Sequence, residues 1–266
     1  SSHIQLAQKA GEALVLLALK SQDNCDRMAR LRVMANGAVV SPEEEEEEQS
    51  IGEGGGGGGG GIPVVEALLG MVSDWDVGDI AMNILRSFCA YGQEWWWSEE
   101  CAKECAKQAV RIMGERGGRA QVAAMGLLAK VAGEVKDMRG LMEEEEEEKQ
   151  GIGGGADAVV SRLVGVLANN VGGPVAKLPA LRRNAVEAAV VLAECHPQIF
   201  ADVFRRHKLG QLLLRVSDSV SDIEDYATFS GAAGMTRHSE SMSALLDRGI
   251  HLFLKCAARP TARPSD

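Results

Sequence analysis

One short helical pattern, a small residue followed by aliphatic ones, recurs four times along the 266-residue chain. The first residues of the copies lie 68, 43 and 64 residues apart, and each long interval contains a low-complexity insertion. Without the insertions Glu43–Gly61 and Met142–Gly155 the spacings become 49, 43 and 50 residues. Stacked helical repeats have a period of about 40–47 residues, so we predict an all-α stack of such repeats. The copies are Ala13–Ala18, Ala81–Arg86, Ala124–Ala129 and Ala188–Ala193.

The composition favours the same fold class. Hydrophobic residues make up 45% of the chain and aromatic residues only 4%, so small aliphatic side chains must build the core, which suits closely packed helices. The net charge of -10 is local, because Glu43–Glu48 and Glu143–Glu148 contribute -12 and leave the remainder at about +2. The six scattered cysteines indicate free buried thiols in a reducing compartment, so we expect an intracellular protein, cytoplasmic or nuclear.

The sequence offers no stretch of membrane-spanning length. The longest apolar run near the start, Ala13–Leu19, is about a third of what a bilayer requires. The chain begins at Ser1 without an initiator Met. The sequence therefore does not decide whether the chain is a fragment with a targeting or membrane segment upstream.

A second helical element precedes two copies of the pattern. Gly61–Leu69 places Pro63 near a helix start, and Ala156–Val164 follows the same design, with Asp157 as its N-cap. The sequence Gly-Ile-Pro-x-Val-x-x-Leu-Leu, followed about 20 residues later by Ala-Met-x-Ile-Leu, resembles the second and third helices of an armadillo repeat. The likeness covers roughly residues 4–38, 62–141 and 156–216. Tyr226–His238 is similar to a segment of uncharacterised plant armadillo-repeat proteins.

This resemblance implies an α-solenoid, an armadillo/HEAT-like right-handed superhelix of stacked helices with low-complexity loop insertions. The fifth position of each copy is Leu and is predicted to point into the seam between repeats. Groove-binding armadillo proteins usually carry Asn at the fourth position, where its amide holds an extended peptide. An aliphatic side chain stands there in every copy and has no donor or acceptor, so the resemblance implies the fold without that amide ladder. The fourth positions are Leu16, Ile84, Leu127 and Val191, and the fifth are Leu17, Leu85, Leu128 and Leu192.

The chain is predicted to divide into six segments. The glycine run Gly54–Gly61 is a spacer, because it lacks the Gly-Lys-Ser/Thr ending of a phosphate-binding loop. Whether the Glu runs are helical or disordered stays open. The segments are an incomplete helical repeat (1–41), a disordered acidic and glycine-rich linker (42–61), armadillo-like repeats (62–141), an acidic and glycine-rich loop (142–155), C-terminal armadillo-like repeats (156–256) and a disordered tail (257–266).

Trp95, Trp96 and Trp97 are the candidate protein-interaction residues. Three consecutive helical residues spread over about 200°, so they cannot all face one apolar seam, and at least one is predicted to be exposed. Exposed Trp is typical of a binding hot spot, whereas packing on the next repeat is the alternative.

Basic residues gather in the last third of the chain. They either lie on solvated helix faces or form a patch for an acidic or phosphate-bearing partner. The candidate patch consists of Arg182, Arg183, Arg205, Arg206 and Lys208.

The remaining candidates for chemistry are weak. Cys101 and Cys105 lie four residues apart on a predicted helix, but no further Cys or His pair completes a zinc site. Cys195 and His196 are adjacent, and adjacent helical residues do not face each other. We therefore expect no enzyme, cofactor or metal, but a protein-protein interaction scaffold whose partner and oligomeric state the sequence does not identify. The alternative is an RNA- or phosphate-binding solenoid that uses the basic patch.

Overall fold

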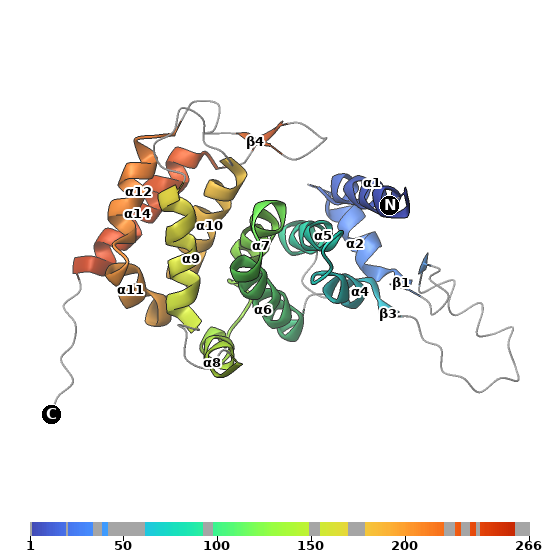
Figure 1. The fold of residues 1–266 in the computed structure, drawn as a ribbon, viewed down its shortest axis with the longest axis horizontal. Coiled ribbons are helices and arrows are strands. Elements are labelled where there is room, and N and C mark those ends of the chain that lie inside the picture. Colours follow the sequence, from blue (N-terminus) through green and yellow to red (C-terminus); the bar gives the residue numbers. More distant parts are fainter. Residues whose placement is uncertain are drawn as a thin grey trace, which may run out of the picture.

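The computed structural model describes residues 2–19, 21–33, 39–41, 62–92, 98–148, 155–169, 179–220, 227–229, 235–237 and 240–258. Over these ranges the chain is mostly helical, with twelve helices and little strand, which confirms the prediction of an all-α protein (Figure 1). The helices are α1 (Ser2–Ala18), α2 (Gln22–Arg30), α4 (Val64–Met71), α5 (Gly78–Tyr91), α6 (Glu99–Glu115), α7 (Gly118–Val131), α8 (Met138–Glu148), α9 (Gly155–Asn169), α10 (Pro179–Cys195), α11 (Pro197–Arg206), α12 (Leu209–Ser217) and α14 (Met242–Ala258).

Five helices, α1, α5, α7, α10 and α14, contact one another in that order and form what we call the first row (Figure 1). Helices α1 and α5 run parallel. Near the start of α1, the side-chain amide of Gln8 donates to the carbonyl of Asp76, just before α5. At the other end, the Cys25 thiol donates to the carbonyls of Ala18 in α1 and Ser87 in α5.

The other neighbours in the first row are parallel as well. Helix α10 runs beside α7 in the same direction. Near the starts of the two helices, Asn184 donates to the carbonyl of Val122, and past their ends Nε2 of His196 donates to the carbonyl of Ala132 over 2.7 Å. Between α10 and α14, Arg183 bonds the carbonyl of Glu240 just before the start of α14, and Glu194 meets Arg248 further along. Equivalent ends of these helices therefore lie at the same side of the row.

The helices α4, α6, α9 and α12 form a second row. Each of them packs on the first-row helix that follows it in the chain: α4 on α5, α6 on α7, α9 on α10 and α12 on α14. Arginines join two pairs of neighbours within the second row. Arg116, after α6, donates to the carbonyl of Asp74, after α4, and Arg162 of α9 donates to the carbonyl of Val110 of α6. Helices α8 and α11 lie against α9, and α2 lies against α5.

Local signals explain several helix starts. The hydroxyls of Ser21, Ser98 and Ser241 accept backbone N–H bonds at the starts of α2, α6 and α14, and Pro197 occupies the first turn of α11. Asp157 was predicted to be the N-cap of α9, and this prediction is wrong. Helix α9 already begins at Gly155, and the Asp157 carboxylate bonds Arg206 instead.

The core follows the predicted repeat register in three of the four copies. Leu85, Leu128 and Leu192 are completely buried, together with small neighbours that let the helices approach closely. The prediction is wrong for Leu17, whose side chain is 56% exposed. Helix α1 is the first helix of its row, so no further helix covers that side.

The two insertions have different outcomes. Residues 42–61 lie outside the described residues. Helix α8 continues to Glu148, so the second Glu run, which the sequence left open as helical or disordered, is helical within the acidic and glycine-rich segment predicted over 142–155. Glu has a high helix propensity, and the buried Met138, Leu141 and Met142 anchor the helix on which the run continues.

Two small antiparallel sheets accompany the helices. In the first, β1 (Arg32–Val33) lies between β2 (Val39–Val40) and β3 (Ile62–Pro63). Both Val40 and Pro63 pair with Arg32, so the residues that flank the first insertion lie on the two sides of β1. The second sheet, β4 (Ala227–Phe229) with β5 (Met235–Arg237), contacts α10.

None of the helices within the described ranges has the length and apolar character needed to cross a bilayer.

Candidate protein-interaction surface

Polar side chains join neighbouring helices along the first row. We call this set the polar ladder, because its members pair with opposite charges from one helix to the next. Its members are Glu12, Asp79, Arg119, Lys130, Glu187, Glu194 and Arg248.

At the α1 end of the polar ladder, Arg119 joins three helices. Its guanidinium lies 3.2 Å from the carboxylate of Asp79 in α5 and 3.5 Å from that of Glu12 in α1. Glu12 also pairs with Lys9, and these two cations lower the pKa of its carboxyl. Arg119 is exposed, so these pairs orient side chains more than they stabilise the fold.

In the middle of the row, Gly126 of α7 creates space for two polar side chains. A Cβ atom built at Gly126 would lie 2.6 Å from Nη1 of Arg86 in α5 and 2.8 Å from Nδ2 of Asn184 in α10. Arg86 and Asn184 therefore meet over the α7 backbone because residue 126 has no side chain. The Asn184 amide donates to the Val122 carbonyl over 2.8 Å, which leaves its carbonyl oxygen as an acceptor.

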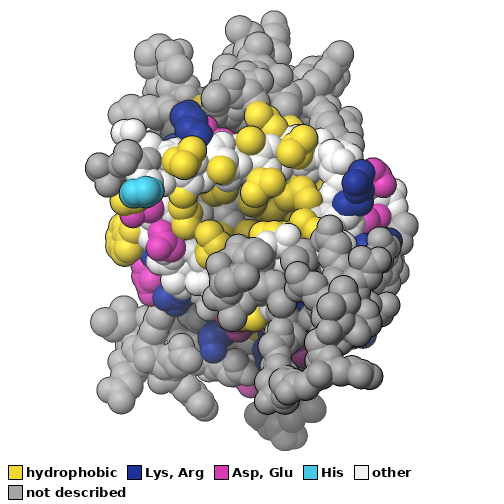
Figure 2. All heavy atoms as spheres, turned by 90° about the vertical axis from the view of Figure 1, so that its right-hand side faces the viewer, with side chains coloured by type: hydrophobic (Ala, Val, Ile, Leu, Met, Phe, Trp, Pro, Cys, Tyr) yellow, Lys and Arg dark blue, Asp and Glu magenta, His cyan; other side chains and the backbone are white. Residues whose placement is uncertain are grey.

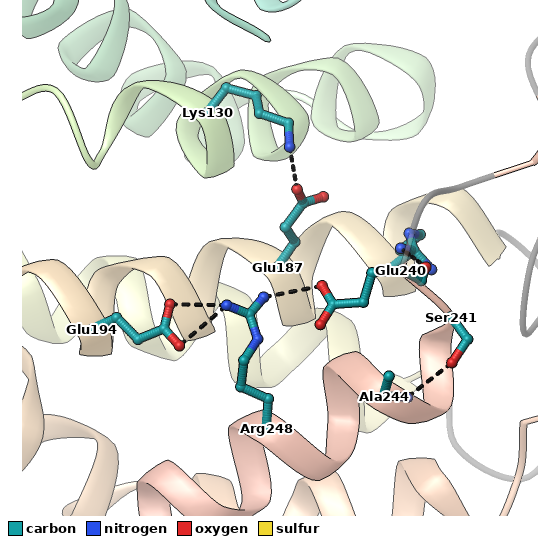
Figure 3. A network of polar contacts seen from close by, with 8 residues as sticks. Lys130, Glu187, Glu194, Glu240, Ser241, Ala244 and Arg248 are labelled. Atoms are coloured by element: carbon teal, nitrogen blue, oxygen red, sulfur yellow. Dashed lines mark hydrogen bonds and ion pairs between the residues drawn. The ribbon is translucent and has the colours of Figure 1, made fainter.

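Beside this pair, Lys130 of α7 forms an ion pair with Glu187 of α10 (Figure 3). Burial alone raises the pKa of Glu187, whose side chain is only 16% exposed. The positive charges of Lys130, Arg86 and Arg183 outweigh that effect, so the pKa is lowered and the carboxylate stays ionised at neutral pH. Arg86 has no hydrogen bond or ion pair with another described residue. Its guanidinium is thus a donor group close enough to Glu187 to lower the pKa of that carboxylate.

At the α14 end, Arg248 bridges two carboxylates (Figure 3). Its guanidinium lies 3.1 Å from Glu194 of α10 and 3.0 Å from Glu240, which precedes α14. The polar ladder therefore extends over the whole first row.

The structure corrects the interpretation of the fourth position in the repeated pattern. Ile84 and Leu127 are core residues, Val191 is half-buried and Leu16 is exposed at the end of the row. These positions do not form one lining of the surface. The asparagines on these helices are instead Asn83, one residue earlier in its copy, and Asn184, which precedes its copy. An isolated Gly inside a helical pattern was the sequence signal for Gly126, since it commonly marks close approach.

Trp95, Trp96 and Trp97, the predicted interaction residues, lie outside the described residues. Another tryptophan, which the sequence reasoning did not select, is the most exposed large hydrophobic side chain among those described. Trp75, in the connection between α4 and α5, is 81% exposed, and the Arg116 guanidinium lies 4.2 Å from the centre of its ring. This arrangement is typical of a cation–π contact.

The predicted basic patch is wrong for two of its five residues. Arg182 is 1% exposed and Arg183 5% exposed. Arg182 donates to the Ser219 hydroxyl and Arg183 to the Glu240 carbonyl, so both hold the segments flanking α12 and α14 against α10. Such contacts offset part of the cost of burying these charges.

Of the other three members, two form ion pairs and one is exposed. Arg205 pairs with Asp202, and Arg206 pairs with Asp157, where Arg206 and His207 lower the pKa of the carboxyl. Lys208 is exposed and adopts the left-handed backbone conformation, with φ of 53°, in the tight turn between α11 and α12. The support for the RNA- or phosphate-binding alternative is correspondingly reduced.

The cysteine and histidine candidates have structural surroundings. The thiols of Cys101 and Cys105 interact directly, and this contact lowers the pKa of Cys101 and raises that of Cys105, which burial raises further. His196 is buried against the Ala132 carbonyl, whereas Cys195 is exposed. Across the residues that the structure describes, no three or more His, Cys, Asp or Glu side chains gather to hold a metal ion.

No protein-family model, curated protein or solved structure shows a significant match to this chain.

Proposed function

We propose that this chain is a non-enzymatic protein-interaction scaffold, built as an armadillo-like α-solenoid and working without a cofactor. The observation that carries the proposal is the parallel first row, in which four of the five helices have a second-row helix behind them. Repeats stacked in this way present one long, continuous surface, and such surfaces bind extended segments of partner proteins.

The binding region we propose is the middle of the first row, around Arg86. The Arg86 side chain is half-buried, whereas Gly126 and Asn184 beside it are buried, so Arg86 is the group that a partner can reach. The guanidinium of Arg86 suits an acidic side chain of the partner.

Affinity capture with three forms of the full chain tests this proposal. The forms are the natural chain, Arg86→Ala, and Arg215→Ala as a matched control, because Arg215 is exposed on α12 away from the first row. We expect at least one protein to be retained by the natural chain and the control and reduced about tenfold or more with Arg86→Ala, the effect of losing about 1.4 kcal/mol of binding. Circular dichroism checks that both variants stay folded. Retention of the same proteins in the same amounts by all three forms would contradict the proposed site.

A further inference from the structure

Exposed apolar side chains are concentrated at the end of the molecule where α1 lies. Figure 2 shows hydrophobic side chains gathered over that end. Of the eleven large apolar residues that are exposed among those described, nine lie between residues 4 and 75, and five of these belong to α1. The five are Ile4, Leu6, Leu14, Leu16 and Leu17.

Helix α1 has two apolar faces, but only one of them is covered. The covered face packs on α5 through Gly11, Val15 and Ala18, and Gly11 allows a close approach because its Cβ would lie 2.6 Å from Cγ2 of Ile80. On the opposite side an exposed apolar stripe runs along the helix at helical spacing. A helix that is apolar on both sides is normally covered on both. The exposed stripe consists of Leu6, Ala10, Ala13 and Leu17.

The exposed stripe has the same order of side chains in both directions, large, small, small, large. If a second α1 packs on it antiparallel, with the two-fold axis between residues 11 and 12, Leu6 lies opposite Leu17 of the other copy. Ala10 then lies opposite Ala13 of the other copy. Two crossing helices are closest at the centre and diverge toward their ends, so small residues at the centre and large ones outside fill the contact.

The charges of α1 agree with this arrangement. Lys9 and Glu12 are its only Lys, Arg, Asp or Glu residues, and both lie on one flank of the helix, Lys9 next to the exposed stripe and Glu12 nearer the covered face, where it also pairs with Arg119. The two-fold axis places that flank of both copies on the same side, so Lys9 of each copy comes near Glu12 of the other. A parallel two-fold pair would instead place the two flanks on opposite sides of the contact, where these charges do not meet.

Other coverings fit less well. The insertion at residues 42–61 departs from this end of the fold, but Ile51 is its only large apolar residue. Head-to-tail stacking would place the exposed stripe on α14, whose exposed residues include Ser243, Asp247 and Arg248. Such stacking would also continue without closing, whereas a two-fold contact closes after two copies.

We propose that two copies of this chain pair through α1, antiparallel, with the exposed stripes of the two helices in contact. The contact lies at the end of the first row, apart from the region around Arg86, so it does not depend on the function proposed above.

The test is the molar mass of the full chain in solution, measured by light scattering or sedimentation over about 1–100 µM. We expect twice the chain mass. Leu6→Glu and Leu17→Lys each place a charge against an apolar residue of the other copy, so each should weaken the dimer about 100-fold or more. The double variant Leu6→Glu with Leu17→Lys brings opposite charges together at both ends of the contact and should regain about tenfold or more of that loss.

Leu214→Glu is the matched control, because Leu214 is also an exposed leucine but lies on α12. It should leave the dimer unchanged. The proposal is overturned if the natural chain has the mass of one copy, or if the dimer survives both single substitutions. A double variant that is as weakly associated as the single ones overturns the antiparallel pairing. Since Leu6 and Leu17 are exposed in the single chain, circular dichroism should show all variants folded.

Discussion

The two outermost helices of the first row, α1 and α14, hold equivalent places but present different surfaces. The exposed residues of α14 include Ser243, Asp247, Arg248 and His251, whereas those of α1 are mainly Leu, Ile and Ala. A stack of helices is soluble when its terminal helices turn a polar face outward. Over its described residues the α14 end is the more polar of the two, with Leu254 as its one large exposed apolar residue, and the α1 end has the surface of an interior helix that lacks a neighbour.

An interior helix shows what α1 lacks. Helix α7 lies between α5 and α10 and packs on α6, and its residues from Ala123 to Ala129 are all buried. Helix α1 has a similar apolar sequence, but α5 and α2 are its main neighbours. The stability of each helix in a stack comes chiefly from its neighbours, so equivalent substitutions in α7 and α1 should differ in their effect.

The largest expected difference concerns the fifth position of the repeated pattern. Leu128→Ala opens a cavity in α7 and should lower the free energy of unfolding by about 2–5 kcal/mol. Leu17→Ala should lower it by less than about 1 kcal/mol, because Leu17 is already exposed. Urea denaturation of both variants, at a concentration where the chain is monomeric, measures this. Equal losses would mean that α1 is covered in the folded chain.

The next effect concerns the ion pair between Lys130 and Glu187 in the interior of the row. Glu187→Gln removes the charge at nearly constant volume and should cost about 1–3 kcal/mol at pH 7. Because folding lowers the pKa of Glu187 below its ordinary value of 4.5, the stabilisation is complete above that value and is lost as the pH falls through the lowered pKa.

The difference in stability between the natural chain and Glu187→Gln should therefore be constant from about pH 7 to 5 and shrink below about 4.5. Denaturation at a series of pH values measures it. A difference that grows toward low pH would contradict the sign of the pKa change.

A smaller effect tests how closely α1 is held on α5. Gly11→Ala forces its new Cβ toward the branched side chain of Ile80, so α1 must move outward. We expect a loss of about 1 kcal/mol, the strain being partly offset by the better helix propensity of Ala. The control is Gly165→Ala in α9, where nothing lies within 4 Å of the added atom and stability should stay the same or rise. Faster amide hydrogen exchange confined to α1 should accompany the first substitution only.

The smallest effect belongs to the polar end of the row. Arg248→Ala removes both contacts to Glu194 and Glu240, which are partly exposed, and should cost less than about 1 kcal/mol. The cost should fall further in about 1 M salt, which screens surface pairs. A loss as large as that of Leu128→Ala would show that α14 is held by charge and not by its apolar face.

The sequence predicted the row of helices better than the surface along it. Spacing of apolar residues identifies the buried face of a helix, so Leu85, Leu128 and Leu192 were placed correctly. The same spacing says nothing about whether another helix covers that face, which is why Leu17 was misplaced. The pattern of residues within one helix does not show whether a neighbouring helix is present.

The polar residues were harder to predict, because their partners are distant in sequence. In the sequence Arg182 and Arg183 look like solvated charges, because their hydrogen-bond partners, Ser219 and Glu240, lie beyond α12 in the chain. The meeting of Arg86 with Asn184 depends on three helices at once, and only the unusual Gly126 indicates it locally.

The most direct test of the parallel first row is a disulfide between the ends of α7 and α10. A Cβ atom at Gly133, just after α7, would lie 3.7 Å from Sγ of Cys195, the last residue of α10. Gly133→Cys should therefore form a cross-link with Cys195 under mild oxidation. Alkaline pH will help, because burial raises the pKa of the Cys195 thiol.

Peptide mass spectrometry identifies the bond, and Gly117→Cys, at the opposite end of α7, is the matched control. Because the two helices are parallel, the account predicts a bond from position 133 to Cys195 and none from position 117. A bond to Cys195 from position 117 and none from position 133 would show that the helices run in opposite directions, and the parallel row would be wrong.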